Sequence, residues 1–224
     1  MANDLANSKY GLSLVVLRNV PLFSGLDQAE LEKLSRVAGR RRATRGEFIV
    51  RAGDVTDALY ILLNGSAKVT NCDEEGREII LAMLGPGEFF GEMGLIDGSP
   101  RSANVVAQEA CELLLMSKAD FQRCMQDNFQ VALKLMRILV QRLREADRKI
   151  ESLALLDVYG RVARLLLEMS ELRDGRRVVA KKISKQDMAR MIGASREMVS
   201  KVVRDLENSG YIRYEGDVIF IIGE

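Results

Sequence analysis

The sequence predicts an α+β protein with three successive parts. These are an N-terminal β-roll of the jelly-roll type over residues 1–118, a long helix over residues 119–156 and a C-terminal winged helix-turn-helix over residues 157–224. Glycines separate short apolar runs in the first part, and the second part contains neither glycine nor proline from Ala119 to Leu156. In the third part, two short helical patterns joined by a glycine precede a final alternating segment.

Composition excludes several classes of protein. Hydrophobic residues make up 47% of the chain and charged residues 29%, which is ordinary for a globular protein. No apolar run approaches the roughly 18 residues that a membrane helix needs. The N-terminal residues M-A-N-D-L-A-N-S-K-Y lack the apolar core of a signal peptide. We therefore expect a cytoplasmic protein that does not associate with membranes.

The composition excludes catalytic and metal sites that depend on histidine. The chain has no histidine, which excludes histidine-based catalysis, histidine-ligated haem and a typical zinc finger. Its three cysteines, Cys72, Cys111 and Cys124, are far apart and odd in number, so we expect reduced structural thiols. No pairing of a nucleophile with a base is visible. The sequence predicts neither an enzyme nor a metal site, and no obligatory cofactor.

Short strands separated by glycine turns predict the β-roll. The apolar runs Phe48 to Val50, Leu59 to Leu63 and Ile79 to Leu84 lie between glycines at the spacing of a roll. Before them, we expect a helix capped by Asp27, with its apolar positions facing the roll.

One segment of the roll, F-G-E-M-G-L-I-D-G-S-P-R-S-A from Phe90 to Ala103, combines the groups that bind a sugar phosphate. Glycines let backbone N–H groups approach an anion closely, an arginine offers paired donors to a phosphate, and a carboxylate can accept from a ribose hydroxyl. The same composition also occurs in rolls that bind no nucleotide. The predicted effector-binding residues here are Gly91, Glu92, Met93, Gly94, Arg101 and Ser102.

The long helix carries an apolar stripe whose members are spaced alternately four and three residues apart. This is the period of a coiled-coil seam, and it predicts a parallel homodimer. A helix packed on its own domain would show a similar stripe. In the dimer, Arg142 and Asp147 of opposite copies would form an ion pair. The predicted seam consists of Ala132, Met136, Leu139, Leu143, Ala146, Ile150 and Leu153.

The C-terminal part predicts a helix-turn-helix. Ser184 is a suitable cap for a first short helix, Gly193 supplies the turn, and Ser195 caps a second helix. The apolar positions of the second helix, Met198 among them, are expected to pack inward and leave a polar, basic face outside. The closing segment turns at Gly216 and predicts a β-hairpin wing. Together these features predict binding to double-stranded DNA.

Charge is unevenly distributed along a chain whose net charge is only +1. From Arg173 to Arg204 there are ten basic residues and three acidic ones. A local basic surface of this kind is typical of phosphate binding, although a solvated loop would show the same charge.

These segments closely resemble the bacterial cyclic-AMP receptor/FNR family of transcription regulators. The segment from Phe90 to Ala103 matches, and so, in order, do L-A-L-L-D-V-Y-G-R and I-G-A-S-R-E-M-V. The resemblance implies a cyclic nucleotide in the roll, a palindromic operator and RNA polymerase as partners. It implies base reading by Arg196 and Glu197, chemistry that suits guanine and cytosine, with Lys201 where the family usually has a second arginine. The complete set of expected DNA-binding residues is Lys185, Gln186, Ser195, Arg196, Glu197, Ser200 and Lys201.

The identity of the nucleotide depends on two positions of the long helix. Cyclic-AMP binders of the family present adjacent threonine and serine to adenine, and those places are filled here by Ala146 and Asp147. A carboxylate only accepts hydrogen bonds, and the guanine edge presents two adjacent donors. We therefore expect cyclic di-GMP or another guanine messenger, with cyclic AMP as an alternative. A constitutive DNA-binding protein with a vestigial nucleotide site is the other reading.

Overall fold

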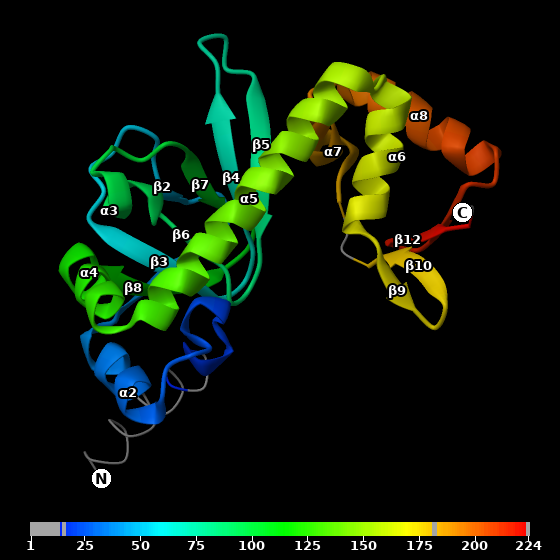
Figure 1. Ribbon diagram of the computed structural model, residues 1–224. Helices are drawn as coiled ribbons and strands as arrows, with labels where there is room; N and C mark the ends of the chain where they lie inside the picture. Colours follow the sequence, from blue (N-terminus) through cyan, green and yellow to red (C-terminus); the bar gives the residue numbers. More distant parts are fainter. Residues whose placement is uncertain (1–13, 15–16, 181–182, 223–224) are drawn as a thin grey trace. The chain divides into compact units, whose positions relative to one another are not determined.

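The computed structural model describes residue 14, residues 17–180 and residues 183–222 of the chain (Figure 1). The chain divides into two compact units, with the main boundary inside one long helix between Arg142 and Leu143. The first unit contains the β-roll and the second contains the helix-turn-helix. The predicted α+β architecture is confirmed.

Two four-stranded sheets form the roll. The first has the strand order β1 (Gly39–Ala43), β8 (Cys111–Ser117), β3 (Ala58–Asn64) and β6 (Phe89–Phe90). The second has the order β2 (Phe48–Val50), β7 (Asn104–Ala107), β4 (Ala67–Cys72) and β5 (Glu78–Leu84). The turn from β3 to β4 requires a glycine, since Gly65 has a φ of 87° and a Cβ atom there would overlap the Ala110 carbonyl.

Side chains that alternate along these strands form two cores. Ile61 and Leu114 contribute to one cluster together with Leu31 of a preceding helix, and Leu62 and Leu113 contribute to the other. Neighbouring residues of β3 thus belong to opposite faces of its sheet, as the strand period of two requires. The roll therefore has an interior of its own and a second core under the surrounding helices.

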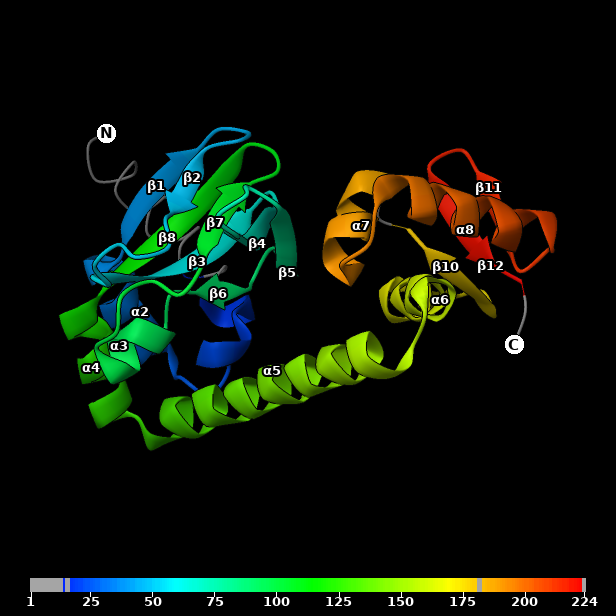
Figure 2. The ribbon, with the colours of Figure 1, turned by 90° about the horizontal axis from the view of Figure 1, so that it is seen from above.

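Short helices flank the roll, as Figure 2 shows for α2 (Gln28–Val37), α3 (Met93–Asp97) and α4 (Lys118–Asp127). A 3₁₀ turn, η1 (Pro21–Phe23), precedes α2. The predicted Asp27 cap is confirmed: its carboxylate accepts from the Glu30 backbone N–H at 2.9 Å, while the Glu30 carboxylate accepts from Asp27 N–H at 2.8 Å. This reciprocal capping box fixes where α2 begins.

The prediction of a single helix from Ala119 to Leu156 is wrong. The segment forms α4 and a separate helix α5 (Phe129–Leu155), because Asn128 leaves the helical region with φ −133° and ψ 91°. Asparagine favours such breaks, since its side chain competes with the backbone for hydrogen bonds. Within the described part of the chain, no helix combines the length and the apolar character needed to cross a membrane.

The second unit consists of helices packed on a four-stranded sheet. Its elements along the chain are α6 (Val158–Met169), β9 (Glu171–Arg173), β10 (Arg176–Val179), α7 (Lys185–Ile192), α8 (Arg196–Asn208), β11 (Ile212–Glu215) and β12 (Val218–Ile221). The strand order is β11-β12-β10-β9. The predicted wing is the β11–β12 hairpin, which turns at Gly216 with a φ of 63°.

The β9–β10 hairpin is an additional element that the expectations from the sequence do not include. Its turn consists of Asp174 and Gly175, with φ angles of 47° and 74°. Positive φ at both central residues is the mark of a type I′ turn, for which Asp-Gly is a preferred dipeptide. The dipeptide was therefore a usable signal. Part of the basic stretch that begins at Arg173 lies on this hairpin, while Lys181 and Lys182 fall outside the described residues.

Candidate effector and DNA-binding sites

The predicted phosphate-binding segment begins at Phe90, the last residue of β6, and includes the whole of α3. Gly91 has a φ of 88°, and a Cβ atom there would overlap the Arg101 guanidinium. A Cβ atom on Gly94 would likewise overlap the Ser99 carbonyl and the Thr56 side chain. Both glycines are thus required by close packing within the segment, in addition to any approach of a ligand.

Arg101 lies folded into the roll. Its Nη1 donates to the Gly91 carbonyl at 2.9 Å, and its Nη2 donates to the Ala58 carbonyl at 2.7 Å and lies 3.4 Å from Asp57 Oδ1. The guanidinium also lies 5.5 Å from the centre of the Tyr60 ring. The side chain is 4% exposed. Arg101 therefore joins two parts of the phosphate-binding segment, at Gly91 and at its own position, to the start of β3.

Glu92, which we expected to accept from a ribose hydroxyl, is buried and has a partner within the chain. Its Oε1 accepts from Arg142 Nη1 at 2.7 Å. Arg142 Nη2 donates to the Phe89 carbonyl at 2.7 Å, and the guanidinium stacks 4.8 Å from the Phe89 ring centre. Arg142 thus has partners within its own chain, whereas the expected pairing was with Asp147 of a second copy. The Glu92–Arg142 pair attaches α5 to the phosphate-binding segment, residues 90–103, which is the effector segment of the roll.

The remaining predicted effector residues lie at the surface. The Ser102 hydroxyl donates to Met93 Sδ at 3.8 Å, a weak contact that leaves its oxygen available to an incoming group. Met93 is 55% exposed. Asp147 is exposed on α5, and its carboxylate has no hydrogen bond or ion pair with any residue that the structure describes. Arg101, Glu92 and Ser102 thus belong to one segment, while Asp147 is free on another element.

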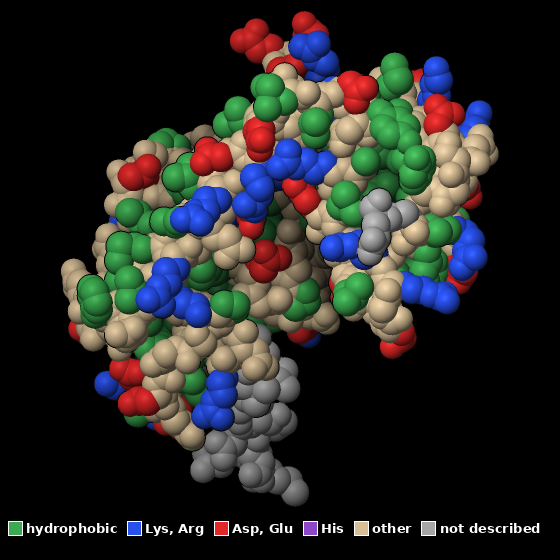
Figure 3. All heavy atoms as spheres, turned by 45° about the vertical axis from the view of Figure 1, so that its right-hand side comes forward, with side chains coloured by type: hydrophobic (Ala, Val, Ile, Leu, Met, Phe, Trp, Pro, Cys, Tyr) green, Lys and Arg blue, Asp and Glu red, His purple; other side chains and the backbone are tan. Residues whose placement is uncertain are grey.

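The residues of the predicted dimer seam differ in how exposed they are along α5. Val131 and Leu135 are buried in the core under the roll, and Leu139, a predicted seam residue, packs against the same core. The exposed stripe instead contains Val140, which we did not predict. Ala132 is partly buried, whereas Met136, Leu143, Ala146, Ile150 and Leu153 are exposed as a seam requires. Figure 3 shows that hydrophobic side chains reach the surface in small groups among charged ones.

The helix-turn-helix forms as predicted. The Ser184 hydroxyl accepts from the Asp187 backbone N–H at 3.0 Å and begins α7, while the Ser195 hydroxyl accepts from Met198 N–H at 3.1 Å and begins α8. Gly193 ends α7 in the left-handed conformation with a φ of 63°. Both predicted caps are confirmed, and each fixes the first residue of a helix.

Most of the predicted DNA-binding side chains lie on the exposed faces of α7 and α8. Val199, Val202, Val203 and Leu206 are buried against the core of the unit. The prediction that Met198 packs with them is wrong, since it is 46% exposed at the first turn of α8. Ser200 is half-buried, and the other predicted residues are exposed, namely Lys185, Gln186, Ser195, Arg196, Glu197 and Lys201. An exposed basic face over an apolar one is what insertion into a major groove requires.

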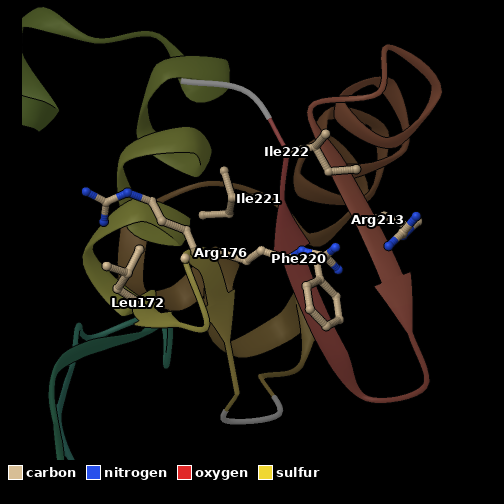
Figure 4. Close-up of a pocket in the computed structure, with 8 residues that line it drawn as sticks. Leu172, Arg176, Arg213, Phe220, Ile221 and Ile222 are labelled. Atoms are coloured by element: carbon tan, nitrogen blue, oxygen red, sulfur yellow. The ribbon is translucent and has the colours of Figure 1, made fainter.

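A separate hollow of about 470 Å³ lies on the sheet of the second unit (Figure 4). It contains three arginines and no carboxylate among its lining residues, and none of the predicted site residues lines it. The lining residues are Leu172, Gly175, Arg176, Arg177, Arg213, Phe220, Ile221 and Ile222.

The three cysteines are free thiols, as predicted. Burial raises the pKa of Cys124 to about 11, and it also raises the pKa of Cys111. Both thiols are therefore protonated at neutral pH and are poor nucleophiles. Cys72 is exposed, which differs from the structural role expected for it.

Comparison with protein families finds two matches along the chain. Residues 40–128 match the cyclic nucleotide-binding domain, and residues 160–222 match the Crp-like helix-turn-helix domain. The first match includes the segment that holds Arg101, and the second includes α7 and α8.

Relatives over most of the chain are transcription regulators. The chain is 37% identical to the cAMP-activated global transcriptional regulator Vfr of Pseudomonas aeruginosa, over 86% of this chain and 94% of Vfr. It is 36% identical to the cAMP-activated regulator CRP of Haemophilus influenzae, over 78% of this chain and 80% of that protein. The structure of the c-di-GMP responsive regulator CLP of Xanthomonas campestris matches with a TM-score of 0.74 and 29% identity, covering 88% of this chain and all of CLP.

Proposed function

Because the chain belongs to the cyclic-AMP receptor/FNR family of bacterial transcription regulators, we propose that it binds a palindromic operator as a homodimer and responds to a cyclic nucleotide in its β-roll. The observation that carries the proposal is the pair α7 and α8, whose exposed face presents Arg196 and Glu197 at the start of α8. A guanidinium can donate to guanine O6 and N7, and a carboxylate can accept from cytosine N4.

Signal transmission in this proposal runs from the effector segment into α5. Glu92 belongs to the effector segment and Arg142 to α5, so a ligand that competes for Glu92 changes how α5 is held. An effector shifts the equilibrium only if it binds one arrangement of the dimer better than the other. The proposed setting is the bacterial cytoplasm, with RNA polymerase as a further partner.

Two nucleotide classes compete for the effector role. The cAMP-activated relatives favour cyclic AMP, whereas the likeness to CLP and the unpartnered Asp147 carboxylate favour a guanine messenger such as cyclic di-GMP. Arg101 supports a constitutive alternative, because internal carbonyls already accept from both of its terminal nitrogens. Calorimetric titration of the protein with cyclic AMP, cyclic GMP and cyclic di-GMP separates the three, since a constitutive regulator binds none of them.

Replacing Arg196 by alanine should weaken binding to the specific operator by about 1–3 kcal/mol and relax the preference for one guanine. The reason is loss of a paired donor to a base edge. Lys185→Ala is the matched control. If Lys185 contacts only phosphate, its loss should weaken binding to all DNA sequences alike and reduce the slope of log K against log salt concentration by about one. Fluorescence anisotropy on matched and single-base-changed duplexes measures both. If the Arg196→Ala protein keeps the sequence preference of the parent protein, Arg196 does not read a base and the assignment of α8 as the recognition helix is wrong.

Replacing Asp147 by alanine should lower affinity for a guanine messenger about 10- to 100-fold, since a charged acceptor is lost. Affinity for cyclic AMP should stay nearly unchanged. Glu145→Ala is the control, because it removes a carboxylate two residues away on the same helix. Titrations are made at protein concentrations where sedimentation shows a single species. Equal loss for every ligand, or binding of cyclic AMP alone by the parent protein, would contradict guanine recognition.

A further inference from the structure

An apolar side chain is exposed in the first turn of α8, the helix that we assign to the major groove. Met198 is 46% exposed, whereas Val199 and Val202 of the same helix are 0% and 6% exposed. The Ser195 hydroxyl accepts from the Met198 backbone N–H at 3.1 Å, and this bond caps the helix. The main chain of Met198 is therefore fixed by the cap, while its side chain extends into solvent.

Met198 lies at one border of the polar face of α8. Residues three and four positions apart are neighbours on a helix surface, so Met198 lies beside Lys201 on one side and beside the buried Val202 on the other. Around the helix axis it is about 60° from Lys201 and about 100° from Glu197. Glu197 and Lys201 are both exposed and belong to the expected DNA-binding set. Met198 thus continues the surface that these two side chains form.

The polar side chains of this surface leave one base-edge group without a matching partner. Guanidinium, ammonium and carboxylate groups bond the polar atoms that bases present in the major groove, whereas thymine also presents a C5-methyl group. A methyl group is matched only by apolar surface. Among residues 195–201, all of which the structure describes, Met198 is the one exposed apolar side chain. Its unbranched chain and polarisable sulfur adapt easily to a neighbouring methyl group.

We propose that Met198 is a specificity-determining residue, which packs against the C5-methyl group of a thymine in each half of the operator. This inference rests on the proposed binding of DNA and adds a base to those assigned to Arg196 and Glu197. The contact removes apolar surface of both partners from water, which favours the complex. Because it neutralises no phosphate, it adds nothing to the salt dependence of binding.

Deoxyuridine tests the contact directly, because it lacks the C5-methyl group of thymine and keeps every hydrogen-bonding group. The full chain first selects its site from a random-sequence duplex library. Each thymine of that site is then replaced singly, and affinity is measured by fluorescence anisotropy with any effector that binding requires. One position in each half-site should lose affinity about fourfold for the parent protein, and replacing both should lose about 16-fold, as expected for one methyl group per contact.

Three variants assign the loss to Met198. Met198→Ala should bind the thymine duplex about as weakly as the parent protein binds the doubly replaced one, and it should not distinguish the two duplexes. Its slope of log K against log salt concentration should equal that of the parent. Met198→Leu keeps an apolar side chain and should retain most of the preference for thymine. Leu172→Ala is the matched control, since Leu172 is a 72% exposed apolar residue of β9 in the same unit and should leave affinity and preference unchanged.

The outcomes separate this inference from the proposed function. If the deoxyuridine duplexes lose the same affinity with Met198→Ala as with the parent protein, the loss is a property of the DNA and Met198 reads no methyl group. If no thymine of the selected site is sensitive to replacement, the contact does not exist. In both cases the assignment of Met198 is overturned and binding to DNA stands. A parent protein that selects no site from the library would overturn sequence-specific binding itself.

Discussion

Replacing Arg101 by leucine should reduce cyclic nucleotide affinity by about 2–4 kcal/mol, or roughly 30- to 1,000-fold, through loss of the proposed phosphate donor. The structure adds a second consequence. Arg101 donates to the carbonyl of Gly91, in the effector segment, and to the carbonyl of Ala58, in β3. Leucine leaves both acceptors unpaired, and each buried group without a partner costs about 1–3 kcal/mol.

Two further variants separate ligand binding from folding. Arg101→Lys keeps the charge but cannot bond two carbonyls at once, so it should recover part of the nucleotide affinity and little of the stability. Arg45→Leu removes an exposed arginine of the same roll and should leave both unchanged. Calorimetric titration measures affinity, and scanning calorimetry measures unfolding. Full nucleotide affinity in a folded Arg101→Leu protein would show that the phosphate lies elsewhere.

Features encoded over a few residues were predictable from the sequence. Asp27, Ser184 and Ser195 each cap the helix that the sequence assigned to them, because a capping side chain bonds a backbone N–H only three residues later. Gly193 ends α7 for an equally local reason, as the left-handed conformation at a helix end favours glycine. These local signals were sufficient to place the helix-turn-helix.

Features that depend on distant residues were not predictable. Glu92 and Arg142 are 50 positions apart, and no periodicity connects them. The choice between Leu139 and Val140 as a seam residue also depends on which side of α5 the roll covers, since both are apolar and adjacent. Adjacent residues of a helix lie about 100° apart, and Met136, Leu143 and Ile150 belong to both stripes, so exchanging Leu139 for Val140 turns the centre of the free face by about half of that angle. The sequence pattern predicts the spacing of the apolar residues along α5, whereas tertiary packing decides which side of the helix remains exposed.

Replacing Arg142 by methionine should destabilise the first unit by about 2–3 kcal/mol, near the lower end of the cost of breaking a buried ion pair. Glu92 is 3% exposed on its side chain, so its carboxylate would remain buried without a partner. Arg142 is 34% exposed, which allows water to reach the site and limits the loss. The Phe89 carbonyl would also lose its donor.

Scanning calorimetry should show the corresponding transition about 5–10 °C lower than in the parent protein. Arg144→Met is the control on the same helix, where an exposed arginine gives way to methionine without a buried partner. Adding Glu92→Gln to Arg142→Met removes the stranded charge and should recover part of the loss, and the double-mutant cycle isolates the coupling between the two side chains. If the two losses simply add, the 2.7 Å contact does not stabilise the fold. A large coupling energy would instead establish that the contact between the effector segment and α5 stabilises the protein. Such coupling is the condition for a ligand that binds at Glu92 to change the position or stability of α5.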